Sequence, residues 1–168
     1  MDFRRLEDAC VEGKTALVRV DFNVPRADDG SITDDTRLQS AIPTINALLQ
    51  AGAKIVLLSH FGRPKGTPDP EMSLKFIVPA LASALDCDVY FSTDIKKAAI
   101  DAMPAGNVML LENTRFHAGE TKGDPELAKA YAGLGDIFVA DAFSISHRAH
   151  ASSTGIADYI PADAGLAL

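Results

Sequence analysis

Four short, largely apolar runs in this chain each end directly in a cluster of charged or hydrogen-bonding side chains. The runs cover residues 16–20, 55–58, 108–111 and 137–139, and helix-like stretches separate them. Apolar runs of this length are typical of strands that are buried on both faces of a parallel sheet. In open α/β sheets, ligands bind beyond the carboxyl ends of the strands. The pattern therefore predicts one binding site built from four loops.

The loops after these runs suit a small anion. Three of them contain arginine, and all four histidines of the chain lie in or beside the arginine-bearing loops. Guanidinium groups match the oxygens of carboxylates and phosphates bidentately, which favours a small, doubly anionic ligand. The residues concerned are Asp21, Asn23, His60, Gly62, Arg63, Arg115, His147, Arg148 and His150.

Plainer interpretations of these loops remain open. Asp21 and Asn23 also fit a strand-end turn closed by side-chain-to-backbone hydrogen bonds. Each of the three loop arginines alone fits an ordinary surface residue, although three at equivalent strand ends favour a shared site. Arg19 stands inside the first run and is interpreted as a structural pairing residue.

The segment after the first run predicts an amphipathic helix. Apolar residues recur at i, i+4, i+7 and i+11 from Leu38, which places them on one helical stripe. Residues 34–36 offer N-cap chemistry, and Gly52 stands where a C-terminal stop belongs. Pro43 is expected to kink this helix or to divide it in two. Arg37 falls in the first turn, at the end nearest the predicted site.

The remaining segments continue the alternation of helices and strands. We expect a helix over residues 73–85, a strand over 88–91, a helix over 94–103 and another helix from Asp124. Regular β-α alternation predicts an α/β fold with a three-layer, doubly wound, Rossmann-like parallel sheet. The whole chain, residues 1–168, is expected to form one domain.

Composition argues against several classes of partner. The net charge of −7 disfavours nucleic acids and anionic membranes, because binding to either rests on a basic face. No apolar run approaches the length that spans a membrane. Cys10 and Cys87 are far apart in sequence and form no C-x-x-C pair, which suits a reduced, cytoplasmic protein.

Three motifs resemble binding signatures without matching them. Residues 13–15 end like a phosphate-binding P-loop, but Asp8 stands where that motif needs glycine, and a strand follows them instead of preceding them. Residues 133–135 lack the third glycine of a dinucleotide fingerprint. His147 and His150 have no cysteine or carboxylate at ligand spacing, so no metal site is expected.

Taken together in order, the loop segments resemble the N-terminal domain of the phosphoglycerate kinase family. The resemblance rests on residues 18–25, 58–66, 112–116 and 141–152, and it runs from the first strand to the last residue. It implies a domain that binds 3-phosphoglycerate or 1,3-bisphosphoglycerate. The family's C-terminal domain, which binds Mg-ADP or Mg-ATP, is expected to be absent from this chain.

The resemblance also implies roles for individual residues. Asp21, Asn23 and Arg37 would bind the hydroxyl and carboxyl end of the substrate. The phosphate would be held by His60, Arg63, Arg115 and Arg148, with His147 and His150 lining a basic patch, and Gly62 would also contact the substrate. Arg37 is the expected catalytic residue, since a guanidinium stabilises a moving phosphoryl group without changing protonation. His60 is expected to form hydrogen bonds and not to act as a general base, because an attacking carboxylate has no proton to lose.

Two features depart from the family pattern. Residues 144–146 read Ser-Ile-Ser where the family often has Gly-Thr-Ala, which affects how closely the backbone approaches a ligand. Residues 159–168 stop on apolar side chains, as in a fragment cut before its next element. The family's nucleotide lysine, glycine-rich phosphate loop and magnesium aspartate have no counterpart here. We therefore expect a monomer that has no cofactor of its own and partners with the second domain.

Two other classes of function stay open at this point. One is a stand-alone, non-catalytic module that uses the same pocket to sense or carry a phosphorylated metabolite. The other is a structural domain whose apolar C-terminal tail docks on a partner.

Overall fold

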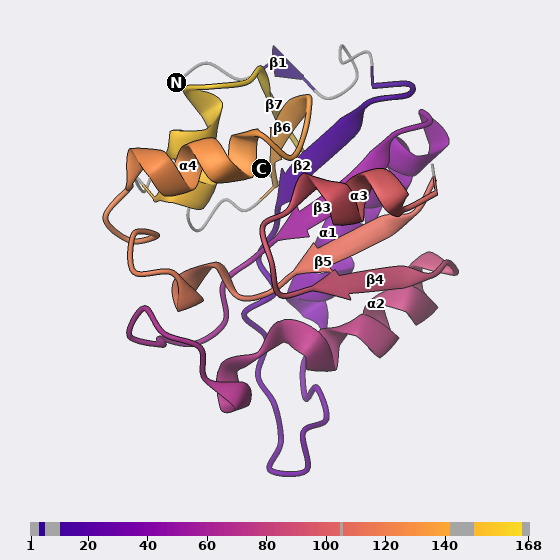
Figure 1. The fold of residues 1–168 in the computed structure, drawn as a ribbon. Coiled ribbons are helices and arrows are strands. Elements are labelled where there is room, and N and C mark those ends of the chain that lie inside the picture. The colour runs from indigo at the N-terminus through magenta and orange to yellow at the C-terminus, as the bar shows by residue number, and fades with distance from the viewer. Residues whose placement is uncertain (1–3, 6–10, 105, 142–149, 166–168) are drawn as a thin grey trace.

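The computed structural model describes residues 4–5, 11–104, 106–141 and 150–165. Its centre is a seven-stranded sheet in the order β1-β7-β6-β2-β3-β5-β4, and every neighbouring pair of strands is parallel (Figure 1). The strands are β1 (Arg4–Arg5), β2 (Thr15–Arg19), β3 (Lys54–Leu58), β4 (Val89–Ser92), β5 (Val108–Leu111), β6 (Ile137–Ala140) and β7 (Ala162–Ala164). The predicted α/β fold with a doubly wound parallel sheet is confirmed.

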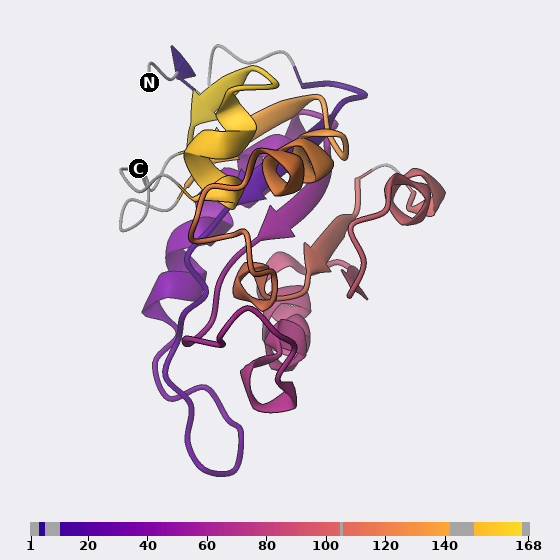
Figure 2. The ribbon, with the colours of Figure 1, turned by 60° about the vertical axis from the view of Figure 1, so that its left-hand side comes forward.

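Helices cover both faces of this sheet (Figure 2). The α-helices are α1 (Thr36–Gln50), α2 (Val78–Leu85), α3 (Lys97–Ala102) and α4 (Pro125–Ala132). The short helical turns are η2 (Pro70–Met72), η3 (Leu74–Ile77), η4 (Thr114–Phe116) and η5 (Ala151–Gly155). Alternate residues of β2 point to opposite faces: Val18 packs with α1 and α2, whereas Leu17 packs with α3 and α4. Two buried apolar layers therefore enclose the sheet.

Helix α1 rules out one of the two expectations for Pro43. The helix is a single element of 15 residues that contains Pro43, so it is not divided in two. Buried Leu38, Ile45 and Leu48 anchor it to the sheet, and this packing outweighs the one hydrogen bond that a proline removes. The predicted stop at Gly52 is confirmed: its φ is +87°, and its N–H donates to the carbonyl of Leu49 at 3.1 Å.

Other helix starts differ by a few residues. The expected helix over residues 73–85 begins with the 3₁₀ turn η3, whose cap is the Ser73 hydroxyl, and becomes α-helical only at Val78. The expected helix over 94–103 is shorter, since α3 begins at Lys97. The cap at Asp124 forms as predicted, with its carboxylate accepting from the N–H of Glu126 at 3.2 Å.

Strands β1 and β7 were not predicted. β7 lies within the apolar tail and pairs with β6 in parallel, and β1 extends the sheet beyond β7. Both are short, with two and three residues, so neither produces a recognisable apolar run. Among the described residues, no helix combines the length and the apolar character needed to cross a membrane.

Candidate functional site

The site begins where the chain leaves β2. Phe22 is fully buried, so the flanking Asp21 and Asn23 face away from the core and are partly exposed. The N–H of Asn23 donates to Asp21 Oδ1 at 3.1 Å, which is the side-chain-closed turn considered from the sequence. The N–H of Phe22 donates to Ser59 Oγ at 2.9 Å and so joins this exit to the end of β3. Asp21 and Asn23 can therefore close this turn and still be available to bind a ligand.

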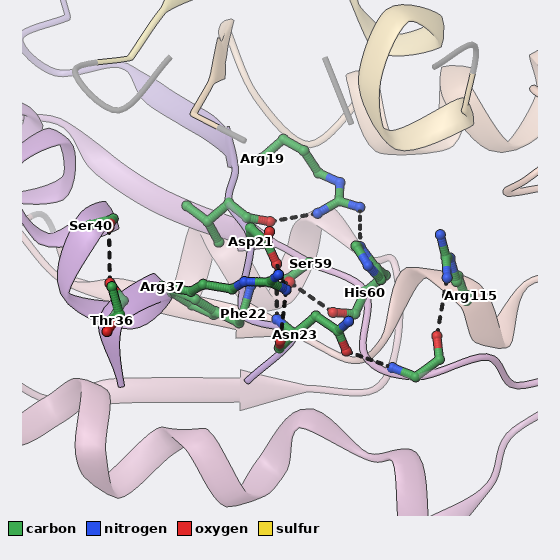
Figure 3. Close-up of polar contacts among 12 residues, drawn as sticks. Arg19, Asp21, Phe22, Asn23, Thr36, Arg37, Ser40, Ser59, His60 and Arg115 are labelled. Atoms are coloured by element: carbon green, nitrogen blue, oxygen red, sulfur yellow. Dashed lines mark hydrogen bonds and ion pairs between the residues drawn. The ribbon is translucent and has the colours of Figure 1, made fainter. Parts of the chain in front are cut away.

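Arg37 projects from the first turn of α1 towards this exit (Figure 3). Its Nη1 donates to the carbonyl of Asn23 at 2.9 Å and lies 3.5 Å from Asp21 Oδ1. The Arg37 side chain is 52% exposed, so its remaining donors are open to solvent and to a ligand. The contact to Asn23 therefore aims the guanidinium beside the strand end without burying its charge.

Gly62 closes the loop after β3 against Asn23. Its N–H donates to Asn23 Oδ1 at 2.9 Å, and its φ is +63°, a conformation that favours glycine. A Cβ added here would also lie 3.2 Å from the sulfur of Met72. A glycine at this position thus lets the loop backbone meet the Asn23 side chain directly.

Arg115, in the loop after β5, completes a hydrogen-bonded series across three loops. Its Nη1 donates to the carbonyl of Gly62 at 3.1 Å, and its backbone N–H donates to Asn113 Oδ1 at 3.0 Å. Figure 3 shows Asn23, Arg37, His60 and Arg115 gathered at one end of the sheet. The loops after β2, β3 and β5 therefore meet, as their strand order predicts.

His60 lies inside this group and is 7% exposed. Its Nδ1 is 3.0 Å from Nη2 of Arg19, which reaches it from the last residue of β2. The backbone carbonyl of His60 accepts from Ser59 Oγ at 3.0 Å. Backbone and ring are thus both held by neighbouring side chains.

Arg63 and Arg115 line separate hollows beside the loop over residues 63–70. Arg63 is exposed and borders a cavity of about 340 Å³ that Lys65 also lines. Arg115 borders another of about 240 Å³ with Lys65, His117 and Lys122. Asn23 and Arg37 line a third, of about 590 Å³. Arg63 thus lines a different cavity from Arg115 and from Asn23 and Arg37, and the hydrogen bonds among the described residues do not connect it to them.

The fourth loop is placed only in part. His147 and Arg148 lie outside the described residues, as do residues 144–146. His150 is described and 9% exposed, and its carbonyl accepts from the N–H groups of Ser153 and Gly155, both at 3.2 Å. Across the described ranges, no group of three or more His, Cys, Asp or Glu side chains is arranged to hold a metal ion.

Asn113 organises the site, although the sequence pattern did not single it out. This fully buried side chain accepts from the N–H groups of Phe61 and Arg115 at 3.2 and 3.0 Å. Its amide donates to the carbonyls of Phe61 and Met72 at 2.6 and 3.0 Å. The amide therefore ties together three separate segments. Its place in a polar cluster directly after an apolar run was the available signal, but that place does not reveal these partners.

Replacing Asn113 with alanine is expected to lower the free energy of unfolding by about 2–4 kcal/mol, because several buried backbone groups lose their partners at once. Urea unfolding followed by circular dichroism measures the change. The matched control is Asn107→Ala, since the amide of Asn107 makes one exposed hydrogen bond, to the carbonyl of Pro104. Equal unfolding midpoints for the two variants would contradict the role given to Asn113.

In chemical terms the site presents hydrogen-bond donors and positive charge. Arg37, Arg63 and Arg115 supply guanidinium groups, and the carboxylate of Asp21 offers an acceptor for a hydroxyl. The described residues thus suit a ligand with anionic ends and a hydroxyl group.

Comparisons with known proteins identify the family of this chain. The family model described as phosphoglycerate kinase matches residues 6–168. The phosphoglycerate kinase of Rhodospirillum centenum is 56% identical over 169 residues, which are 98% of this chain and 42% of that protein. That of Zymomonas mobilis is 56% identical over 173 residues, or 100% of this chain and 43% of that protein.

Solved structures give the same result. The phosphoglycerate kinase from Coxiella burnetii superposes with a TM-score of 0.89 at 37% identity, covering 99% of this chain and 42% of that one. The enzyme from Pyrococcus horikoshii superposes with a TM-score of 0.87 at 34% identity, covering 98% and 43%. The chain thus spans less than half the length of these relatives. Fold, loop residues and family model together show that this chain belongs to the phosphoglycerate kinase family.

Proposed function

We propose that this chain is the substrate-binding N-terminal domain of a phosphoglycerate kinase and binds 3-phosphoglycerate or 1,3-bisphosphoglycerate. The observation that carries the proposal is the hydrogen-bonded series Asn23–Gly62–Arg115, which brings together the loops that follow three parallel strands. Arg37 lies beside the same Asn23. A ligand with a carboxylate at one end and a phosphate at the other needs donors spread in this way.

Within this proposal the two ends of the ligand have separate partners. Asp21, Asn23 and Arg37 bind the hydroxyl and carboxyl end, since they meet at the exit of β2. The phosphate is bound by His60, Arg63, Arg115 and Arg148, with His147 and His150 lining a basic patch, and Gly62 is a further substrate-binding residue. The phosphate end therefore receives most of the positive charge.

The reaction we propose is phosphoryl transfer between the ligand and a nucleotide. A carboxylate oxygen of 3-phosphoglycerate attacks the terminal phosphorus of ATP, the bond from that phosphorus to the ADP oxygen breaks, and 1,3-bisphosphoglycerate and ADP result. Charge develops on the transferred group, so Arg37, at the carboxyl end, stabilises the transition state as the catalytic residue. No proton leaves the attacking carboxylate, and His60 serves as a donor.

The nucleotide and its magnesium ion are proposed to bind on a second, C-terminal domain of a longer enzyme. That domain is the partner we propose for this chain, in a monomeric cytoplasmic protein. Closure of the two domains would bring the reactants together and exclude water.

Titration calorimetry tests the proposal directly. 3-Phosphoglycerate is expected to bind this chain at one site, and added sulfate should weaken the binding by competing for the same donors. Glycerate, which lacks the phosphate, is the matched ligand control and should bind at least about tenfold more weakly. Absence of heat at millimolar 3-phosphoglycerate, with a folded chain, would overturn the proposal.

A further inference from the structure

Arg19 is a buried cation at the end of β2, and its side chain makes hydrogen bonds well beyond the strand. Its side chain is 1% exposed, and among the described residues it is the largest side chain that is fully buried. Its Nη1 donates to the carbonyl of Val20 at 2.6 Å and its Nε donates to Ser152 Oγ at 3.0 Å. The remaining terminal nitrogen, Nη2, lies 3.0 Å from His60 Nδ1. The guanidinium thus ends on the ring of a candidate ligand-binding residue (Figure 3).

A buried carboxylate balances the charge of this arginine. Glu120 is fully buried, and its carboxylate accepts two hydrogen bonds from Ser152. One comes from the Ser152 hydroxyl, and the other comes from the Ser152 backbone N–H at 2.8 Å. Ser152 therefore connects Glu120 to Arg19. Burial lowers the pKa of Arg19 to about 10, against the opposing effect of Glu120 and Asp21. The guanidinium accordingly stays charged at neutral pH and keeps all its protons.

The chemistry of a guanidinium fixes the direction of its hydrogen bond to His60. Arginine has five N–H donors and no acceptor, so at this contact the ring must accept. Nδ1 of His60 then carries its lone pair towards Arg19, and the proton of a neutral ring lies on Nε2. The alternative tautomer would bring two N–H groups together at 3.0 Å.

We propose that Arg19 is a positioning residue that holds His60 as a neutral imidazole with its proton on Nε2. The identity of the ligand in this inference rests on the proposed function, whereas the protonation of the His60 ring does not. A proton on Nε2 makes that nitrogen a donor, which an anionic phosphate accepts; the other tautomer would present a lone pair instead. The same arrangement prevents Nδ1 from acting as a base.

The first test reads the ring in the chain without ligand. A ¹⁵N–¹H correlation spectrum at pH 7 is expected to show the His60 ring with a protonated Nε2 and an unprotonated Nδ1, with the assignment made from the spectrum of His60→Ala. The ring of His117 contacts Tyr131 and has no described contact with Arg19, so its signals should change less than those of His60 in Arg19→Met. A His60 ring protonated on Nδ1, or on both nitrogens, overturns the inference even if 3-phosphoglycerate binds.

The second test separates positioning from general support of the fold. Arg19→Met removes the donor and is expected to weaken 3-phosphoglycerate binding about tenfold, whereas Arg19→Lys keeps a cationic donor and should lose less. In a His60→Ala background, the same Arg19→Met change should alter the dissociation constant less than about twofold. Equal losses in both backgrounds would mean that Arg19 acts on the fold and not through His60. If neither form binds 3-phosphoglycerate while the tautomer is as stated, the proposed function fails and the ring assignment stands.

Discussion

Alanine in place of Arg37 is expected to lower kcat by about 10²–10³-fold in a two-domain kinase that carries this chain, with a much smaller change in KM. The physical reason is that a stabilising interaction that strengthens in the transition state affects the rate more than ground-state binding. Arg37 is 52% exposed and is held by the carbonyl of Asn23 at 2.9 Å, so its loss should leave the fold intact. Steady-state kinetics with ATP and 3-phosphoglycerate measures both constants.

The matched comparison uses the arginines proposed to hold the phosphate. Arg63→Ala and Arg148→Ala should mainly raise KM for 3-phosphoglycerate, since their contacts are the same in the ground and transition states. Arg37→Lys keeps the charge but loses the planar fork, and we expect it to recover part of kcat. An Arg37→Ala enzyme with unchanged kcat and a raised KM would remove Arg37 from the catalytic role.

The sheet and the location of the site were predictable because buried parallel strands leave a clear pattern. Each apolar run of the sequence became a strand with ends within one residue of the prediction, as in β3 (Lys54–Leu58) and β5 (Val108–Leu111). A strand buried on both faces is largely apolar, so polar residues gather where the strand ends. Asp21 and Asn23 follow β2 for this reason.

The elements that the sequence did not reveal depend on contacts between distant residues. β7 is three residues long and exists as a strand through its pairing with β6. Helix α1 continues through Pro43 because its buried face packs on the sheet, a tertiary effect that local propensity does not contain. In both cases, contacts with distant residues determine the secondary structure, and the local sequence alone does not.

The hydrogen bonds between side chains of the site could not be predicted from the sequence for a related reason. Arg19 was interpreted as a structural pairing residue, which is correct for its bond to Ser152, 133 positions along the chain. Nothing in the spacing of these residues shows that the same guanidinium reaches the ring of His60. Hydrogen bonds of this kind follow from the fold, because the loops after neighbouring strands meet only once the strand order is known.

The 168-residue chain by itself is expected to fold cooperatively and yet transfer phosphate at least about 10³-fold more slowly than a two-domain kinase. Folding is expected because helices cover both faces of its sheet and two buried apolar layers enclose it. Inactivity is expected because its loops are proposed to bind only the phosphoglycerate, while the nucleotide and its magnesium ion are proposed to bind on a second domain.

Two measurements on the same sample examine the two halves of this prediction. A circular-dichroism melt should show one sigmoidal transition, and a broad, non-cooperative loss of signal would contradict independent folding. A coupled assay with 1,3-bisphosphoglycerate and ADP, on chain freed of host enzyme, should show no turnover above background. Arg37→Ala in the same chain is the matched control: any residual rate that this variant does not lower comes from contaminating enzyme. Turnover near that of a two-domain kinase, abolished by Arg37→Ala, would mean that one domain holds both reactants.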